Sequence, residues 1–212
     1  MKFVTLFLLI FISLNGIAQV FIHPPGLDSI AATQGDLDKD GMEEKVIVYD
    51  TKDTTEEGVV RELIIYKKIK GEWEEWVRSR NAILKSQEGG MMGDPFGDIV
   101  IKNGILSISF NGGSRWKWGY TDKYRYQGNT FRLIGHESTY GTPCEYWQTI
   151  DYNLLTGNLI YKKEFESCDK EQTIVKTEAE NFKIKLPIIT LNDRKSGKIE
   201  IKTPKYKAEL YL

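Results

Sequence analysis

Short segments of alternating apolar and polar residues, separated by tight-turn signals, run through most of the chain and restrict its fold more than any other feature. Asn103-Gly104 predicts a two-residue hairpin, because a type I′ turn needs positive φ at both central positions and these residues tolerate it. A hairpin there pairs Ile101 with Leu106. Ile99 then lies opposite Ile108, so the four apolar side chains share one face.

A second turn, at Gly128-Asn129, places Tyr126 opposite Phe131 and, two residues further on, Tyr124 opposite Leu133. Three more turns are expected at Lys70-Gly71, Thr156-Gly157 and Ser196-Gly197. Turns at this density, without a sustained helical repeat, predict an all-β fold. We expect an antiparallel meander of hairpins forming one curved sheet, a sandwich or a partial propeller-like domain. Residues 169–180 are the one stretch that the sequence allows to be a helix or a loose loop.

The first eighteen residues have the features of a secretory signal peptide. Lys2 gives a positive start, an apolar run follows, and the small residues Gly16 and Ala18 stand where signal peptidase cuts. The run is shorter than the roughly twenty apolar residues that span a bilayer as a helix. We therefore expect residues 1–18 to be removed, leaving residues 19–212 as a single β domain without a transmembrane segment, in the periplasm or outside the cell.

The charge of the chain argues against a nucleic-acid partner. The sequence has 29 basic and 30 acidic residues, and a nucleic-acid-binding domain needs a strong basic excess. Eight Lys or Arg residues gather between positions 183 and 212, against three acidic residues. This segment is interpreted as a solvated edge-strand face, where lysines deter edge-to-edge pairing.

Residues 115–126, RWKWGYTDKYRY, alternate strictly between aromatic and cationic side chains. The even positions hold Trp116, Trp118, Tyr120, Tyr124 and Tyr126, and the odd positions hold Arg115, Lys117, Lys123 and Arg125. One strand therefore buries the aromatic face and exposes the cations, unless a bulge at Gly119 or Thr121 turns part of it outward. The alternative is a carbohydrate-binding module that uses residues 116–126 as a stacking platform. Asp122 falls on the aromatic face and needs a partner if it is buried.

Cys144 and Cys168 are predicted to form a disulfide, because oxidation is the expected state in an exported chain. A hairpin centred on Thr156 places them directly opposite each other. The same hairpin pairs Ile150 with Lys162 and Tyr152 with Ile160. Two free buried thiols are the alternative.

The stretch GDLDKDGMEE, residues 35–44, has the spacing of a calcium-binding loop. Carboxylates stand at loop positions 1, 3 and 5, and Gly41 provides the sharp turn at position 6. An EF-hand would need Glu at position 12, where this chain has Ile47, so a shorter loop that leads into a strand fits better. The predicted calcium ligands are Asp36, Asp38, Asp40, the carbonyl of Met42 and Glu44. An acidic turn without an ion is the alternative.

The longer stretch GDLDKDGMEEKVIVYD resembles the calcium-loop-plus-strand unit of FG-GAP and VCBS repeat proteins, in which Asp-x-Asp-x-Asp-Gly-x-x-Asp/Glu precedes a buried strand. The resemblance covers about twenty residues, in one copy. The wider pattern, including GGMMGDPFGDIVIKNG and KYRYQGNTFRLIG, is similar to uncharacterised secreted bacterial proteins that carry a single such loop. The resemblance implies a fold type, calcium as the cofactor and an exported location, but no reaction.

Motifs for catalysis are weak in this sequence. Ser114 lacks the glycine of a nucleophile elbow, and the only histidines are His23 and His136. Asp94 and Asp98 in GDPFGD could serve acid/base chemistry, but Asp before Pro and between glycines is typical of a turn. We therefore expect no catalytic residue and no organic cofactor.

Two classes of function follow from these patterns. The first is an exported, non-catalytic, calcium-stabilised β domain with a structural or binding role, whose partner is an unknown protein or glycan held by the loops 86–97 and 111–114. The second is a secreted hydrolase with a carboxylate site in the loops 86–98 and 111–114. An enzyme should gather two or more carboxylates in one cleft, whereas a binding domain should present an aromatic or polar surface.

Overall fold

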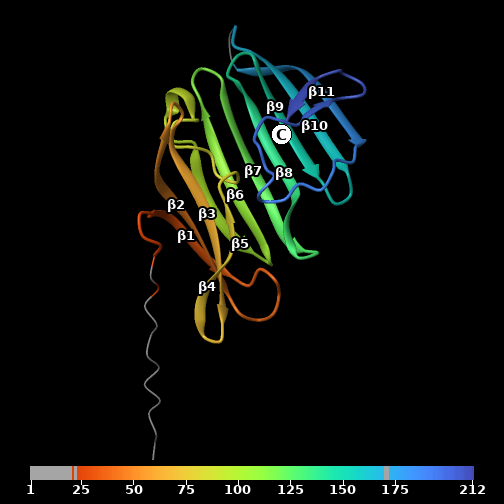
Figure 1. The fold of residues 1–212 in the computed structure, drawn as a ribbon. Helices are drawn as coiled ribbons and strands as arrows, with labels where there is room; N and C mark the ends of the chain where they lie inside the picture. Colours follow the sequence, from red (N-terminus) through yellow and green to blue (C-terminus); the bar gives the residue numbers. More distant parts are fainter. Residues whose placement is uncertain (1–20, 22, 170–171) are drawn as a thin grey trace, which may run out of the picture.

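The computed structural model describes residues 21, 23–169 and 172–212, so the predicted signal peptide lies outside the described residues (Figure 1). Within that part of the chain, regular structure is β-strand apart from one 3-10 turn, η1 (Gly90–Met92). All sheet pairings are antiparallel, which confirms the predicted all-β meander. The described residues contain no helix long and apolar enough to cross a membrane.

The strands form two sheets and a short C-terminal pair, each in chain order. The smaller sheet contains β1 (Asp28–Gly35), β2 (Glu44–Thr55), β3 (Gly58–Ile69) and β4 (Glu72–Ser79). The larger sheet contains β5 (Phe96–Lys102), β6 (Ile105–Gly113), β7 (Lys117–Gln127), β8 (Thr130–Thr142), β9 (Tyr146–Asn153), β10 (Asn158–Ser167) and β11 (Thr173–Lys183). The C-terminal pair is β12 (Glu200–Lys202) with β13 (Glu209–Tyr211).

The two sheets pack face to face over half of the larger one. Val48 and Leu63 of the smaller sheet belong to the same buried cluster as Leu106, Ile108 and Tyr124 of the larger sheet. The other half of the larger sheet is covered by the C-terminal segment, whose Ile201 and Leu210 share a second buried cluster with β9 and β10. Figure 1 shows these two covers lying side by side over the long sheet.

The predicted turns set the register of the larger sheet as expected. Ile101 pairs with Leu106 across Asn103-Gly104, and Ile99 pairs with Ile108. Tyr126 pairs with Phe131 and Tyr124 with Leu133 across Gly128-Asn129. Beyond that pair the ladder shifts by one residue, because Lys123 pairs with Gly135 and leaves Ile134 as an extra residue in β8.

The predicted register between β9 and β10 is wrong by one residue. Ile150 pairs with Tyr161 rather than with Lys162, and Tyr152 pairs with Leu159. The connection is a four-residue loop between Asn153 and Asn158, so its centre lies between Leu155 and Thr156. The Asn153 side chain fixes this loop by accepting a hydrogen bond from the backbone N–H of Thr156 (3.0 Å).

Residues 170 and 171 of the predicted helix or loop at 169–180 lie outside the described residues, and the part from residue 173 onwards is neither a helix nor a loop. Residues 173–180 lie in β11, which pairs with β10 along its whole length. Four β-branched residues begin the strand, Thr173, Ile174, Val175 and Thr177, and such residues favour extended backbone. The ladder hydrogen bonds to β10 then stabilise a strand whose side chains are mostly exposed.

The aromatic face of residues 116–126 is fully buried only at Asp122 and Tyr124. Tyr124 is fully buried, but Trp116, Trp118 and Tyr126 are half-buried, which corrects the prediction that all four lie mostly in the core. Among the cations, Arg115 and Lys117 are exposed, whereas Lys123 and Arg125 are half-buried. β7 pairs with β6 without a bulge, so the aromatic side chains stay on one face of the strand. Some of them are only half-buried because the layer that covers this face ends beside them.

Candidate functional site

The acidic loop between β1 and β2 gathers three of the predicted calcium ligands. Oxygen atoms of Asp36, Asp38 and Asp40 all lie within 4.8 Å of one another. The loop also uses these carboxylates to hold its backbone. Asp36 accepts hydrogen bonds from the N–H groups of Lys39 (2.6 Å) and Gly41 (3.0 Å), both at positive φ.

Glu44 and Lys67 also interact with this acidic loop. Glu44 is buried as the first residue of β2 and accepts a hydrogen bond from the N–H of Leu37 (2.8 Å). Burial raises the pKa of the Glu44 carboxyl. The Lys67 ammonium from β3 forms ion pairs with Asp38, with Asp40 (2.7 Å) and with Glu44 (3.8 Å). Lys67 is therefore the cation that the loop holds in this structure.

The donor set of the loop fits a calcium ion. Asp36, Asp38, Asp40 and Glu44 carry four negative charges, and the single ammonium of Lys67 leaves most of that charge uncompensated. Calcium prefers several carboxylate and carbonyl oxygens in a flexible loop. The fifth predicted ligand is the carbonyl of Met42, an exposed residue whose N–H donates a hydrogen bond to Asp40 (2.8 Å).

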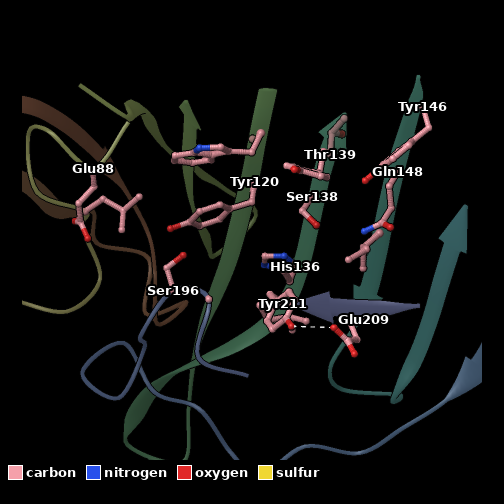
Figure 2. Close-up of a pocket in the computed structure, with 17 residues that line it drawn as sticks. Glu88, Tyr120, His136, Ser138, Thr139, Tyr146, Gln148, Ser196, Glu209 and Tyr211 are labelled. Atoms are coloured by element: carbon pink, nitrogen blue, oxygen red, sulfur yellow. Dashed lines mark hydrogen bonds between the residues drawn. The ribbon is translucent and has the colours of Figure 1, made fainter. Parts of the chain in front are cut away.

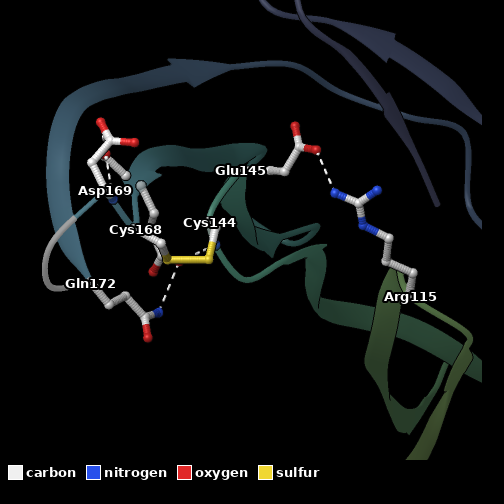
Figure 3. The surroundings of a disulfide bond; sticks show 8 residues. Arg115, Cys144, Glu145, Cys168, Asp169 and Gln172 are labelled. Atoms are coloured by element: carbon white, nitrogen blue, oxygen red, sulfur yellow. Dashed lines mark hydrogen bonds and ion pairs between the residues drawn. A yellow bond between two sulfur atoms is a disulfide. The ribbon is translucent and has the colours of Figure 1, made fainter.

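The predicted disulfide is confirmed. Cys144 and Cys168 are bonded, with their Cα atoms 5.2 Å apart (Figure 3). The disulfide forms although the pairing of β9 with β10 differs by one residue from the prediction, because both cysteines lie outside these strands. Cys144 lies in the turn before β9, and Cys168 follows the end of β10. Glu166 stabilises the region around the disulfide by accepting hydrogen bonds from the Cys144 N–H (3.2 Å) and from Gln172 (2.9 Å). The bond thus ties the β8–β9 turn to the end of β10.

The carboxylates of the GDPFGD loop have structural partners. Asp94 receives two hydrogen bonds from Arg61 (2.6 and 2.5 Å), and Arg61 also contacts Asp50 (2.8 Å). These bonds lower the pKa of Asp94, with Arg61 as the main cause. Asp98 accepts a hydrogen bond from the N–H of Ile99 (2.7 Å). Among the described residues, neither Asp94 nor Asp98 lines the main pocket.

The main pocket lies on the larger sheet, between the loop before β5 and the C-terminal segment (Figure 2). Its volume is about 550 Å³. Five aromatic rings line it, from Trp118, Tyr120, Tyr140, Tyr146 and Tyr211. The polar side chains that line it belong to Glu88, His136, Ser138, Thr139, Gln148, Ser196 and Glu209. Two parts of this lining were predicted from the sequence: the strand that supplies Trp118 and Tyr120, and the loop 86–97, which supplies Glu88.

Strand register explains why these side chains meet. Trp118 pairs with Tyr140, and Tyr140 pairs with Gln148, so one row of the sheet carries all three on the same face. The next row pairs Tyr120 with Ser138. Trp118 also depends on a glycine of β6, because a Cβ at Gly112 would lie 2.4 Å from its ring.

A buried ionic network supports the base of the pocket. The Nδ1 atom of His136 lies 2.7 Å from Oδ1 of Asp122, and the Nε atom of Arg194 donates to Oδ2 (2.5 Å). Burial would raise the pKa of Asp122, but the hydrogen bond from His136 and the charge of Arg194 keep it below its ordinary value. This network is the partner that a buried Asp122 required. Arg194 is thus an exception to the solvated face expected for the basic C-terminal segment.

The His136 ring connects this network to the aromatic lining. It stacks against Tyr120 at 5.6 Å, and Tyr120 stacks against Trp118 at 6.1 Å. Within the described part of the chain, the Nε2 atom of His136 has no hydrogen-bond partner. A hydroxyl group or water that reaches the base of the pocket would supply that missing partner.

The aromatic surface continues beyond the pocket. Trp116 stacks on Tyr140, with ring centroids 5.3 Å apart and planes 12° from parallel, and it also contacts Tyr146 (5.0 Å). The Lys163 ammonium lies 3.5 Å from the centroid of the Tyr146 ring. Flat ring faces therefore extend from the pocket towards the end of β10.

Comparison with known proteins assigns no family. A scan against protein-family models finds no match to the chain, and a search of curated proteins finds none either. The function proposed below is argued from the site itself.

Proposed function

We propose that the chain is an exported, non-catalytic, calcium-stabilised β domain that binds a glycan in the aromatic pocket. The aromatic pocket carries this proposal. Its volume of about 550 Å³ falls within the range of small-ligand sites. The half-buried Trp118 and the exposed Tyr140 offer flat apolar faces, and Ser138 and Gln148 offer hydrogen bonds beside them. This combination suits a sugar ring, which has an apolar face and a rim of hydroxyl groups.

Calcium stabilisation is supported by the acidic loop. Three carboxylates converge within 4.8 Å, and a fourth, Glu44, is buried beneath them. Calcium would neutralise a charge excess that Lys67 only partly offsets, and Lys67 would have to move aside. The ion would then fix the turn between β1 and β2 without taking part in a reaction.

Export to the periplasm or the outside of the cell is supported by two independent features. The disulfide between Cys144 and Cys168 belongs to a compartment that oxidises thiols. Residues 1–18 have the composition of a secretory signal.

A secreted hydrolase is the second candidate, favoured by the pairing of Asp122 with His136 at the base of the pocket. In that case the carboxylate would orient the imidazole, and Nε2 of His136 would take a proton from a water molecule. A His136→Gln variant that keeps glycan binding but loses measurable glycan cleavage would favour the hydrolase. A wild-type protein that binds glycans and never cleaves them would favour the binding domain.

A glycan array followed by calorimetry tests the proposal. The wild-type protein should bind at least one glycan, and Trp118→Ala and Tyr140→Ala should each lose that binding while remaining folded. Trp73→Ala is the matched control, because Trp73 lies on the outer face of the smaller sheet, away from the pocket. Binding that survives both pocket variants would place the ligand elsewhere and contradict the proposal.

A further inference from the structure

The charges of the pocket have one sign. Glu88 enters it from the loop before β5, and Glu209 enters it from β13 (Figure 2). No Lys or Arg side chain is among the described residues that line it. A cleft lined by charges of one sign concentrates ions of the opposite sign. An anionic ligand would be repelled here, and a cationic ligand attracted.

Nearby cations offset only part of this charge. Lys163 lies over the ring of Tyr146, at the edge of the pocket, and the Lys85 ammonium is paired with Glu57. Arg194 lies 5.7 Å from the Tyr120 ring, but Asp122 balances its charge. Lys202 lies 3.8 Å from Glu209, and both side chains are more than half exposed, so solvent screens that pair. The negative field also raises the pKa of Tyr211, first through Glu209 and then through Glu200.

The aromatic rings themselves favour a cation. An ammonium group over the face of Trp or Tyr is attracted by the negative charge of the ring face. The chain already shows this contact next to the pocket, where the Lys163 ammonium lies over Tyr146 at 3.5 Å. Tyr146 itself lines the pocket together with four further aromatic rings.

We propose that the ligand of this pocket is a glycan with free amino groups, whose ammonium groups pair with Glu88 or Glu209 beside the aromatic faces. This inference rests on the proposed glycan-binding function and adds the charge of the sugar. The ring would stack on Trp118 or Tyr140, and the ammonium would pair with a carboxylate. Neutral and acidic glycans of the same length would bind more weakly.

Calorimetry with two tetrasaccharides tests the inference: a glucosamine tetramer and an N-acetylglucosamine tetramer, which lacks the positive charge. The wild-type protein should bind the glucosamine tetramer roughly tenfold more tightly, as expected for a charge-assisted hydrogen bond. The advantage should shrink at about 1 M NaCl, where screening acts within a few ångströms. Glu88→Gln and Glu209→Gln should each weaken binding of the glucosamine tetramer only.

Asp151→Asn is the matched control, because Asp151 is exposed on β9 and its side chain points to the opposite face of the same sheet. This variant should bind both tetramers as the wild type does. Equal affinity for the two tetramers, unchanged by Glu88→Gln and Glu209→Gln, would overturn the inference and leave glycan binding in place. A folded protein that binds neither these tetramers nor any other glycan would overturn the proposed function as well.

Discussion

Asp122 and His136 lie directly opposite each other on β7 and β8, and the hydrogen bond between them is 2.7 Å long. The pair lies between the buried core and the pocket on the larger sheet. On one side Tyr124 is fully buried, and on the other Tyr120 and Trp118 line the pocket. The ionic network that Asp122 forms with Arg194 therefore joins the core to the pocket.

Asp122→Ala should destabilise the fold by about 3–5 kcal/mol, because it leaves the buried Arg194 guanidinium without its carboxylate. Urea denaturation monitored by tryptophan fluorescence measures the loss. Adding Arg194→Met should recover part of it, since the uncompensated charge is then removed. Wild-type stability in the Asp122→Ala single variant would contradict the structural role of the pair.

Calcium should raise the melting temperature of the protein, and chelator should reverse the rise. At a hundredfold excess over the dissociation constant the stabilisation should be about 2.7 kcal/mol. Asp38→Ala should abolish this response, because it removes one of the converging carboxylates. Lys67→Met should strengthen calcium binding, since it removes the competing ammonium. A melting temperature indifferent to calcium in every variant would rule out the site.

The ion pair of Asp94 should make stability depend on pH in the acid range. Arg61 lowers the pKa of Asp94 in the folded state, so the ionised carboxylate stabilises the fold. That contribution is complete above the pKa of an unfolded aspartate and is lost as the pH falls through the lowered folded value. Asp94→Asn should flatten this part of the stability curve. The neighbouring Asp98→Asn serves as control, and equal effects of the two variants would speak against the ion pair.

Removal of the disulfide should lower stability without abolishing the fold. The bond joins residues 24 positions apart, and closing a loop of that size contributes about 3 kcal/mol in the chain-entropy model. The double variant Cys144→Ser with Cys168→Ser should therefore unfold at lower urea concentration, with the same β-sheet circular dichroism in water. Two titratable thiols in the native wild-type protein would show that the bond is absent.

Trp118→Ala should affect binding more than folding. Tyr124→Ala removes a fully buried ring and should cost about 3–5 kcal/mol, whereas Trp118 is half-buried and should cost clearly less. Urea denaturation and glycan calorimetry on the two variants compare the effects directly. A Trp118→Ala protein as unstable as Tyr124→Ala would indicate that the indole serves the core alone.

Turn chemistry made much of the fold predictable. Asn103-Gly104 and Gly128-Asn129 each fix the pairing of the residues beside them, and both registers agree with the structure. The Thr156-Gly157 turn was less informative, because a four-residue loop and a centred turn differ by one residue in register. Strand β11 was not predicted. Most of its side chains are exposed, so the sequence gives no pattern of burial there, and backbone hydrogen bonds to β10 stabilise the strand.

The pocket could not be predicted from local patterns. A regular ladder from the Gly128-Asn129 turn would place Gly135 opposite Asp122, and only the extra residue Ile134 replaces it with His136. Two walls of the pocket come from segments far from β7 in sequence, including Glu88 and Tyr211. The alternation of aromatic and cationic residues in 116–126 predicts the face of the strand on which each side chain lies. It does not show where the layer that covers the aromatic face ends.

The consecutive order of strands in the larger sheet has a consequence for folding kinetics. Each strand from β5 to β11 pairs only with its neighbours in the chain, so the ladder can grow one hairpin at a time with short loop closures. The C-terminal residues that wall the pocket, such as Ser196 and Tyr211, must instead return across more than fifty residues to reach β8. We therefore expect the sheet to form before the C-terminal segment returns to complete the pocket.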